Sequence, residues 1–559
     1  MSAAFTVDSV LPTGVASSRA STEIFMANAG PACSPRSRDA QWSSSRAEHA
    51  VTDEITFYDQ IEAYTGRLSC RVGESMPIHV STRAERYDVV VERWGATREV
   101  VWRSDALPGR YVAPPPDADS AGCDWPVSFE VPAGVARVSG FHLVTLWAAG
   151  ADAGRGVAHA GFVVRPAEPN QRALLVLATN TWNAYNTWGG ASLYTGGHRV
   201  SFRRPWARGL LDRPEVERDD RKARPVRFRE TADPDGEIFQ RYRFEHGYSS
   251  AIGSTGWFTH ERRFVEWAEA EGYGFDYAVS SDLDDPGALE GYDLVLGVGH
   301  DEYWTSSARD AVDGHVRRGG GYVSLSGNTM FWQVRIDDGA MTCHKYRAHL
   351  DDPVVGTAAE STMSGLWCDP LVDRPEWSTL GAGSVFGLYH RFGTATAHGT
   401  GGFTVFRSDH WLFRGTGLGY GDLIGGDDGV VGYETVGCPL TLDELHLPMV
   451  RPVPGMPDDV TVVAFALSSN LGVGDYPKSI AALSDQGDLE FLAERYYGSA
   501  SPENLQRVRN GTAVMLTCRP FGADGGEVVT IGSTDWVFGL AEDQSVRRIT
   551  ANALDRFLG

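Results

Sequence analysis

The sequence lacks the features of several large classes of protein. No stretch approaches the roughly 20 apolar residues that a membrane span needs, so we expect no membrane association. The first ten residues have no basic start followed by an apolar run, so no signal peptide is expected. Basic residues are in deficit, with 50 Lys and Arg against 73 Asp and Glu and a formal net charge of −23. A chain this acidic repels phosphate groups, which argues against nucleic acid as a partner.

Cysteine is sparse, and several catalytic motifs are missing. The seven cysteines are scattered without a Cys-x-x-Cys pair, which disfavours a zinc knuckle or a dense disulfide framework. Reduced thiols in a cytoplasm are the default interpretation. The sequence has no Gly-x-Ser-x-Gly, no His-Glu-x-x-His and no phosphate-binding loop. No cysteine follows the buried strands described below, which argues against a glutaminase-type thiol nucleophile.

The chain of 559 residues is too long for one core, so two or three domains are expected. Residues 1–50 are rich in Ser, Ala, Arg and Pro and predict a disordered arm, although packing of a part of it on the body is an alternative. Residues 51–166 contain short segments rich in β-branched and aromatic residues between turn signals, which predicts a smaller N-terminal β-sandwich domain.

A different pattern follows the Pro-containing linker near residue 166 and predicts an α/β domain over residues 167–559. Continuous apolar runs at 173–178 and 293–297 are typical of strands buried on both faces. Helical spacing alternates with further strands, at helices 264–271 and 308–318 and strands 275–279 and 322–325. This alternation predicts a parallel sheet with right-handed crossovers. Later segments read as strands at 460–468, 511–516 and 526–531 and a final helix at 546–557.

Polar residues follow three of these strands, where sites of open α/β sheets lie. His300 and Glu302 are two residues apart, a spacing that puts both side chains on one face of an extended segment. They could be a metal ligand beside a general base, or an acid/base pair. Alternatively, Glu302 begins the next helix and His300 is hydrogen-bonded in the core. Asn328 could orient a carbonyl or stabilise an oxyanion, or it could simply occupy a left-handed turn.

Tyr185 and Tyr194 lie in a long loop after the first strand, together with several Gly and Trp residues. Tyrosines in such a loop most often serve in packing, and a lone tyrosine is seldom a metal ligand. The residues themselves therefore leave both tyrosines without an assigned role.

Four ordered motifs resemble the C-terminal domain of the large (beta) subunit of N,N-dimethylformamidase, and the likeness spans about residues 170–559. The motifs are WNAYNTWGGASLY at 182–194, LGVGHDEYW at 296–304, LSGNTMFW at 325–332 and GSTDWVFGL at 532–540. The resemblance implies a fold like the class I glutamine amidotransferases, without their cysteine. It also implies a mononuclear iron, as Fe³⁺, held by two tyrosinates and one glutamate.

Carried over onto this chain, the resemblance implies Tyr185, Tyr194 and Glu302 as metal ligands, with His300 and Asn328 as catalytic residues beside Glu302. Phenolate and carboxylate are hard oxygen ligands that suit ferric iron. The first hypothesis is therefore an iron-dependent hydrolase of small linear amides, acting as a homo-oligomer or with a small second subunit. The alternatives are a noncatalytic or carbohydrate-associated binding protein that keeps the fold, and an iron enzyme acting on another carbon–nitrogen bond.

Overall fold

The structure is a computed structural model that describes residues 60–559, apart from 136, 152–155, 215–245, 391–399 and 476–486. The described part is mixed α/β, with several sheets and eight α-helices. The predicted arm at residues 1–50 lies outside the described residues, so it stays a prediction. No described helix is long and apolar enough to cross a membrane. The six cysteines in the described ranges are buried and free of disulfides.

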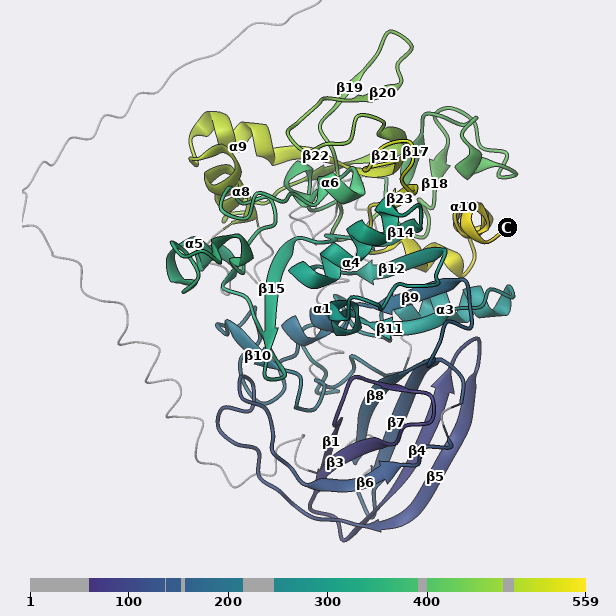
Figure 1. The fold of residues 1–559 in the computed structure, drawn as a ribbon, viewed down its shortest axis with the longest axis vertical. Coiled ribbons are helices and arrows are strands. Elements are labelled where there is room, and N and C mark those ends of the chain that lie inside the picture. The colour runs from purple at the N-terminus through teal and green to yellow at the C-terminus, as the bar shows by residue number, and fades with distance from the viewer. Residues whose placement is uncertain (1–59, 136, 152–155, 215–245, 391–399, 476–486) are drawn as a thin grey trace, which may run out of the picture. The chain divides into compact units, whose positions relative to one another are not determined.

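Two antiparallel-rich sheets occupy the N-terminal part of the described chain, below the α/β sheet in Figure 1. They share one core, in which Ile78 and Val80 of one sheet pack with Val89 and Leu146 of the other. The first sheet contains β1 (Ile61–Thr65), β3 (Met76–Thr82) and β6 (Val127–Val131). The second contains β2 (Ser69–Arg71), β8 (Val157–Arg165), β7 (Gly140–Ala148), β4 (Arg86–Trp94) and β5 (Arg98–Pro108).

These sheets share no strand with the α/β sheet, yet the described residues from 60 onward form one compact unit. Polar bonds join the two parts. Arg93 of β4 makes a paired hydrogen bond to Glu269, at 2.7 and 3.1 Å, and Tyr277 donates to the same carboxylate. Because these bonds hold the two parts in one compact unit, the structure does not separate them into domains. The boundary near residue 166 stays a prediction.

The central sheet has nine strands in the order β11-β9-β12-β14-β23-β22-β21-β17-β18. The first five are parallel: β11 (Asp276–Val279), β9 (Ala173–Leu177), β12 (Leu294–His300), β14 (Gly321–Gly327) and β23 (Val528–Ile531). The other four pair antiparallel: β22 (Asn510–Cys518), β21 (Thr461–Ser469), β17 (Phe403–Val405) and β18 (Leu423–Ile424).

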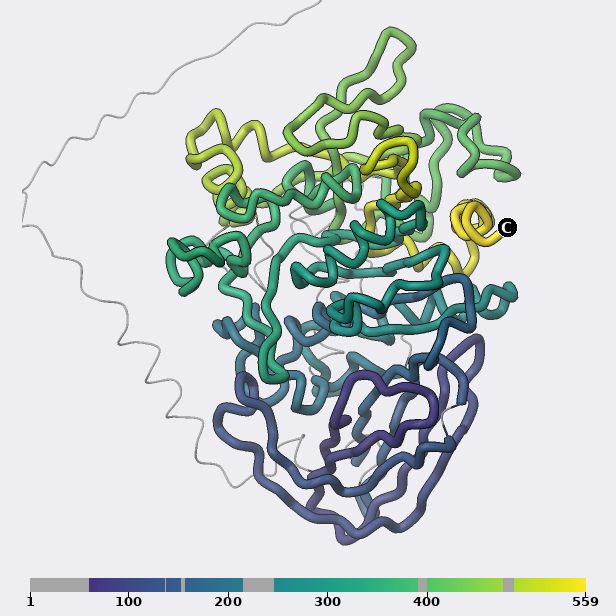
Figure 2. The backbone as a smooth tube through the Cα atoms, in the orientation of Figure 1, coloured from purple at the N-terminus to yellow at the C-terminus, as the bar shows by residue number. Residues whose placement is uncertain are grey.

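The parallel half follows the prediction, and the antiparallel half differs from it. Strands β22 and β23 are joined by residues 519–527, which contain no helix. A connection without a crossover helix returns the chain in the opposite direction, so the two strands pair antiparallel. In the colours of Figure 2, β23 belongs to the yellow C-terminal part of the chain and β14 to its teal middle, and these two strands pair parallel.

Helices cover both faces of this sheet. On one face, α3 (Glu261–Ala270) and α10 (Gln544–Leu558) bury Phe264 and Ile549 against the sheet. On the other, α4 (Ser306–Arg317) and α6 (Trp377–Leu380) bury Val312 and Leu380. The remaining helices are α1 (Thr179–Ala184), α5 (Ala348–Asp351), α8 (Asp488–Tyr497) and α9 (Pro502–Arg509).

The order of the parallel strands creates a crevice at their carboxyl ends. From β9 the chain moves outward to β11 and then returns to β12, on the other side of β9. Connections therefore leave β9 and β12 in opposite directions, and such a switch point is where open α/β sheets bind ligands. The segments that follow β9 and β12 begin there, and the first, predicted as a long loop, opens with the helix α1 (Thr179–Ala184) because the chain turns inward directly after β9.

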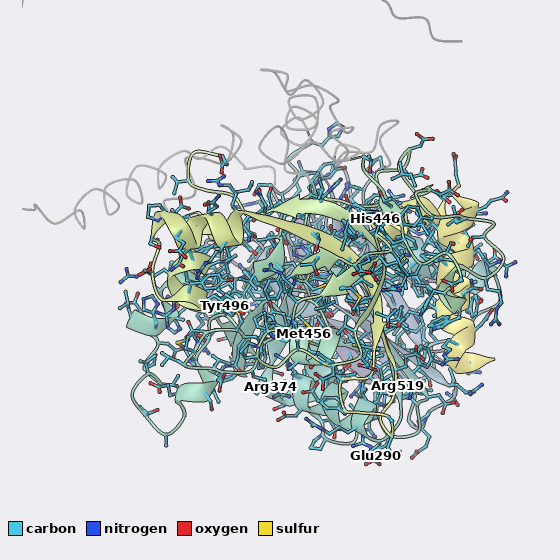
Figure 3. All side chains as sticks on the ribbon, turned by 90° about the horizontal axis from the view of Figure 1, so that it is seen from above. Glu290, Arg374, His446, Met456, Tyr496 and Arg519 are labelled. Carbon is cyan, nitrogen blue, oxygen red and sulfur yellow. The ribbon has the colours of Figure 1, made fainter. Side chains whose placement is uncertain are left out.

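Two smaller sheets complete the described fold. Strands β10 (Arg199–Ser201), β16 (Ala340–Thr342), β15 (Trp332–Asp337) and β13 (Tyr303–Thr305) form one, and β19 (Leu440–Leu442) and β20 (Pro448–Val450) form a hairpin. Tyr496 of α8, labelled in Figure 3, packs edge-on against Trp377 of α6, with ring centroids 5.5 Å apart. This contact fixes α8 beside the elements that support the site.

Candidate active site

The carboxyl end of β12 places His300 and Glu302 at the switch point. Gly299 has φ +80°, and a Cβ there would lie 2.3 Å from the Cβ of His260, so only glycine fits before His300. Beyond the strand, the backbone N–H of Glu302 donates to Thr181 Oγ1 at 2.9 Å. The end of β12 is thereby tied to α1, which follows β9.

His300 is wholly buried between two carboxylates. Its Nε2 lies 2.7 Å from Glu434 Oε2 and 3.3 Å from Glu302 Oε2. Both contacts are ion pairs when the imidazole is protonated, so Nε2 lies between the two carboxylates. The other ring nitrogen, Nδ1, lies 2.9 Å from the carbonyl oxygen of Ser254, which holds the ring in place. His300, Glu302 and Glu434 each offer a donor atom within 4.8 Å of the others.

Tyr194 lies directly on Glu302. Its hydroxyl donates to both carboxylate oxygens, at 2.7 and 2.9 Å. Trp332 donates its indole N–H to Glu302 Oε1 at 2.8 Å, and Tyr303 donates its hydroxyl to the Tyr194 oxygen, also at 2.8 Å. Glu302 therefore does not begin the following helix, as one alternative held, because α4 starts at Ser306 after the strand β13.

Tyr185 joins this group through its ring. Its centroid lies 4.1 Å from that of Tyr194 and 5.5 Å from that of His300. Its hydroxyl lies 3.4 Å from the hydroxyl of Tyr433, which lies 3.4 Å from His300 Nδ1. The structure thus brings together both tyrosines, Glu302 and His300, although the Tyr185 hydroxyl faces Tyr433 instead of the carboxylate.

Asn328 follows β14 in the left-handed conformation, with φ +51°, as a tight turn requires. The glycine before it is packed so closely that a Cβ would lie 2.1 Å from the carbonyl oxygen of Glu434. The Asn328 amide donates to Glu434 Oε2 at 2.9 Å and accepts from Ser384 Oγ at 2.8 Å. The turn and the polar role are therefore both present, and the amide orients Glu434.

Burial and mutual charge set the protonation of these groups. Burial lowers the pKa of His300, but Glu434 and Glu302 outweigh it and raise that pKa to about 10. The positive imidazole holds the pKa of Glu302 below its usual value despite burial, whereas burial raises the pKa of Glu434. Burial and then the charge of Glu302 raise the pKa of both Tyr185 and Tyr194 well above the usual value. Both phenols therefore keep their protons unless a metal ion binds to their oxygens.

Three residues of the site were missed by the sequence analysis. Tyr433 and Glu434 lie in a Gly-Tyr-Glu-Thr segment that belongs to no long helix or strand, so no periodic pattern pointed to them. Lys345 is almost fully buried, with its Nζ 3.3 Å above the centre of the Tyr194 ring and beside three further aromatic rings. For Tyr433 and Glu434, the one signal in the sequence was a tyrosine next to a glutamate after a glycine, a pair of residue types that can bind a metal or move a proton.

Comparison with protein families identifies the family of the chain. A family model described as N,N-dimethylformamidase beta subunit-like, C-terminal, matches residues 88–549. The chain belongs to this family. The matched range contains every site residue named above, and the resemblance predicted from the four motifs is thus confirmed. It begins inside β4, so the family match also covers part of the N-terminal sheets.

Curated relatives match over a short segment only. The N,N-dimethylformamidase beta subunit of an Alcaligenes species is 35% identical over 74 residues, and that of Paracoccus aminophilus is 32% identical over 74 residues. Each match covers 13% of this chain and 10% of the relative, so the alignment spans about a tenth of their length. Among solved structures, a ThuA-like protein of Bacteroides uniformis is 12% identical over 52% of this chain and 83% of that one, with a TM-score of 0.23.

Within this member of the N,N-dimethylformamidase beta subunit-like family, Glu376 supports Asn328 through Ser384 and should make stability depend on pH. It accepts from the backbone N–H of Ser384, which bonds Asn328, and its Oε2 has no hydrogen-bond partner in the described part of the chain. Burial raises the pKa of Glu376 to about 7. The pKa of Glu376 is thus higher in the folded than in the unfolded protein. The contribution of Glu376 to the free energy of unfolding is therefore full below pH ~4.5 and is lost as the pH rises through 7.

Glu376→Gln should remove this loss. We expect the variant to gain up to about 3 kcal/mol relative to the parent between pH 5 and pH 8, measured by urea unfolding at both values. Glu503→Gln is the control, because that carboxylate is 73% exposed on α9. An unchanged pH dependence in Glu376→Gln would contradict the prediction.

Proposed function

We propose that this chain is an iron-dependent hydrolase of small linear amides, with the metal held by Tyr185, Tyr194 and Glu302. The observation that carries the proposal is the contact of the Tyr194 hydroxyl with both Glu302 oxygens, at 2.7 and 2.9 Å. Two oxygen ligands that each lie about 2 Å from one ion are about 3 Å from each other, so this contact has the spacing of a ligand pair.

The donor set fits a ferric ion. Two phenols and a carboxylate are hard oxygen donors, and in the described part of the chain their side-chain hydrogen bonds involve oxygen and nitrogen atoms and no sulfur. The burial that keeps Tyr185 and Tyr194 protonated makes them poor acids alone, and a trivalent cation supplies the charge that offsets this. His300 Nε2 is buried between the carboxylates of Glu302 and Glu434, a position from which the imidazole can exchange a proton.

Amide hydrolysis needs a polarised carbonyl, an activated water and a proton for the leaving amine. When bound, the iron would supply Lewis acidity to the carbonyl and the water. His300, held by the Ser254 carbonyl and paired with Glu434, is placed to transfer a proton to the departing nitrogen. Water adds its hydroxyl to the carbonyl carbon and its proton goes to nitrogen, so the products are a carboxylic acid and an amine. Asn328 keeps Glu434 turned toward His300.

Finer features belong to the same proposal. The parallel strands and their switch point support a glutamine-amidotransferase-like arrangement without its cysteine. The curated relatives are named as a subunit, which supports the proposal that this chain acts in an assembly, either as a homo-oligomer or with a small second subunit. Six free, buried cysteines support a reducing compartment such as the cytoplasm.

The test uses the full chain, purified from cells grown with ample iron. We expect about one iron per chain by elemental analysis and a visible tyrosinate-to-iron absorption band, since the ligands form a site only in the folded protein. The first substrate to try is N,N-dimethylformamide, because the relatives' names point to it. Release of dimethylamine should stop when the iron is chelated and return when iron is restored.

Two results would overturn the proposal. Zinc in place of iron, without a visible band, would indicate a different metal-dependent hydrolase. A metal-free protein that neither takes up iron nor releases amine would leave a binding protein that keeps the fold.

A further inference from the structure

The geometry points to Tyr303 and Trp332 as a pair of positioning residues that hold the ligands Tyr194 and Glu302 in place for the metal. This inference rests on the proposed function, because it takes Tyr194 and Glu302 as ligands. It concerns two residues that belong to none of the ligands and none of the proton-transfer groups described above.

The two donors come from one rung of a sheet. Tyr303 of β13 and Trp332 of β15 are direct cross-strand partners in a parallel pair. Both side chains are almost wholly buried, at 0% and 1% exposure, in one core cluster with Phe331 and Leu366. Their hydroxyl and indole N–H therefore have little freedom, and each meets a different ligand residue at 2.8 Å.

The direction of each hydrogen bond follows from the donors available. The Tyr194 hydroxyl has one hydrogen, which it gives to Glu302, so its oxygen can only accept the hydrogen of Tyr303. The indole of Trp332 is a donor only, so it bonds a Glu302 oxygen as a fixed N–H. When Tyr194 binds a metal, its hydrogen bond to Glu302 is lost, but the bond from Tyr303 remains and becomes charge-assisted.

A hydrogen bond of this kind should be visible in the spectrum of the metal centre. Donation from Tyr303 withdraws electron density from the Tyr194 oxygen, which raises the energy needed to move an electron from that oxygen to ferric iron. Outer residues that hold a metal ligand typically contribute about 10–100-fold to metal affinity. Tyr303 should therefore affect both the absorption band and the affinity, whereas a residue that only fills the core should affect neither.

The experiment compares Tyr303→Phe with Tyr322→Phe in the full-length protein loaded with iron. Tyr322 is an equally buried tyrosine of β14 whose hydroxyl has no hydrogen-bond partner in the described chain, so its variant removes a hydroxyl without removing a bond. We expect Tyr303→Phe to shift the visible band to longer wavelength and to bind iron about 10–100-fold more weakly. Tyr322→Phe should keep the parent's band and affinity.

If Tyr303→Phe does not fold, 3-fluorotyrosine placed at position 303 keeps the ring and makes a stronger donor, so the band should move to shorter wavelength. Suppose that the parent binds iron and the folded position-303 variant keeps the same band and the same affinity. The positioning role of Tyr303 would then be wrong, whereas the proposed metal centre would stand. A parent that takes up no iron would overturn the proposed metal centre and this inference with it.

Discussion

Replacing Glu302 with glutamine is expected to remove most of the bound iron and all measurable amide hydrolysis. The glutamate is the one carboxylate among the proposed ligands, and its oxygens accept from Tyr194 and Trp332. Glutamine keeps the size and one acceptor oxygen but loses the negative charge. Because loss of an outer residue already costs about 10–100-fold in metal affinity, loss of this ligand should cost more than about 100-fold.

The measurements are iron content, the visible band and dimethylamine release. Glu503→Gln is again the control, because it makes the same chemical change at an exposed position. If Glu302→Gln retained iron with an unaltered band, Glu302 would not be a ligand. The cluster of His300, Glu302 and Glu434 would then need a different interpretation.

Replacing His300 with alanine should abolish turnover and also destabilise the metal-free protein. The two interpretations of His300 in the sequence, an acid/base and a buried core histidine, prove compatible, because the imidazole is buried and lies within 3.3 Å of both Glu302 and Glu434. Its removal leaves two buried carboxylates facing each other without the imidazolium that lies between them. Breaking a buried pair in this way typically costs about 3–5 kcal/mol.

A double variant separates stability from catalysis. Adding Glu434→Gln to His300→Ala removes one of the two opposing charges, so we expect it to recover part of the lost unfolding free energy and none of the activity. His142→Ala is the matched control. That histidine is equally buried, is held by the Gly140 carbonyl in the N-terminal sheets and lies outside the site, so its variant should lose stability alone. Full activity in His300→Ala would remove the histidine from the mechanism.

Strong local patterns predicted most of the elements near the site. The apolar run at 173–178 is β9, and the run at 293–297 begins β12, because a strand buried on both faces has few polar positions. The helix predicted at 308–318 is α4. The strands predicted at 460–468 and 511–516 are β21 and β22, but their antiparallel pairing was not predicted, since an apolar run does not record the direction of its neighbour.

By itself, the sequence determined that the chain has an α/β core, that polar residues follow its parallel strands, and which family it resembles. Those features depend on residues close together in the chain, namely apolar runs, turn residues and short motifs. Only the tertiary structure decided what surrounds His300. Glu434 lies 134 positions from it, and Lys345 reaches the Tyr194 ring from a short 3₁₀ helix 151 positions further along the chain. No local pattern records such contacts, because packing of the whole core sets the distances between these side chains.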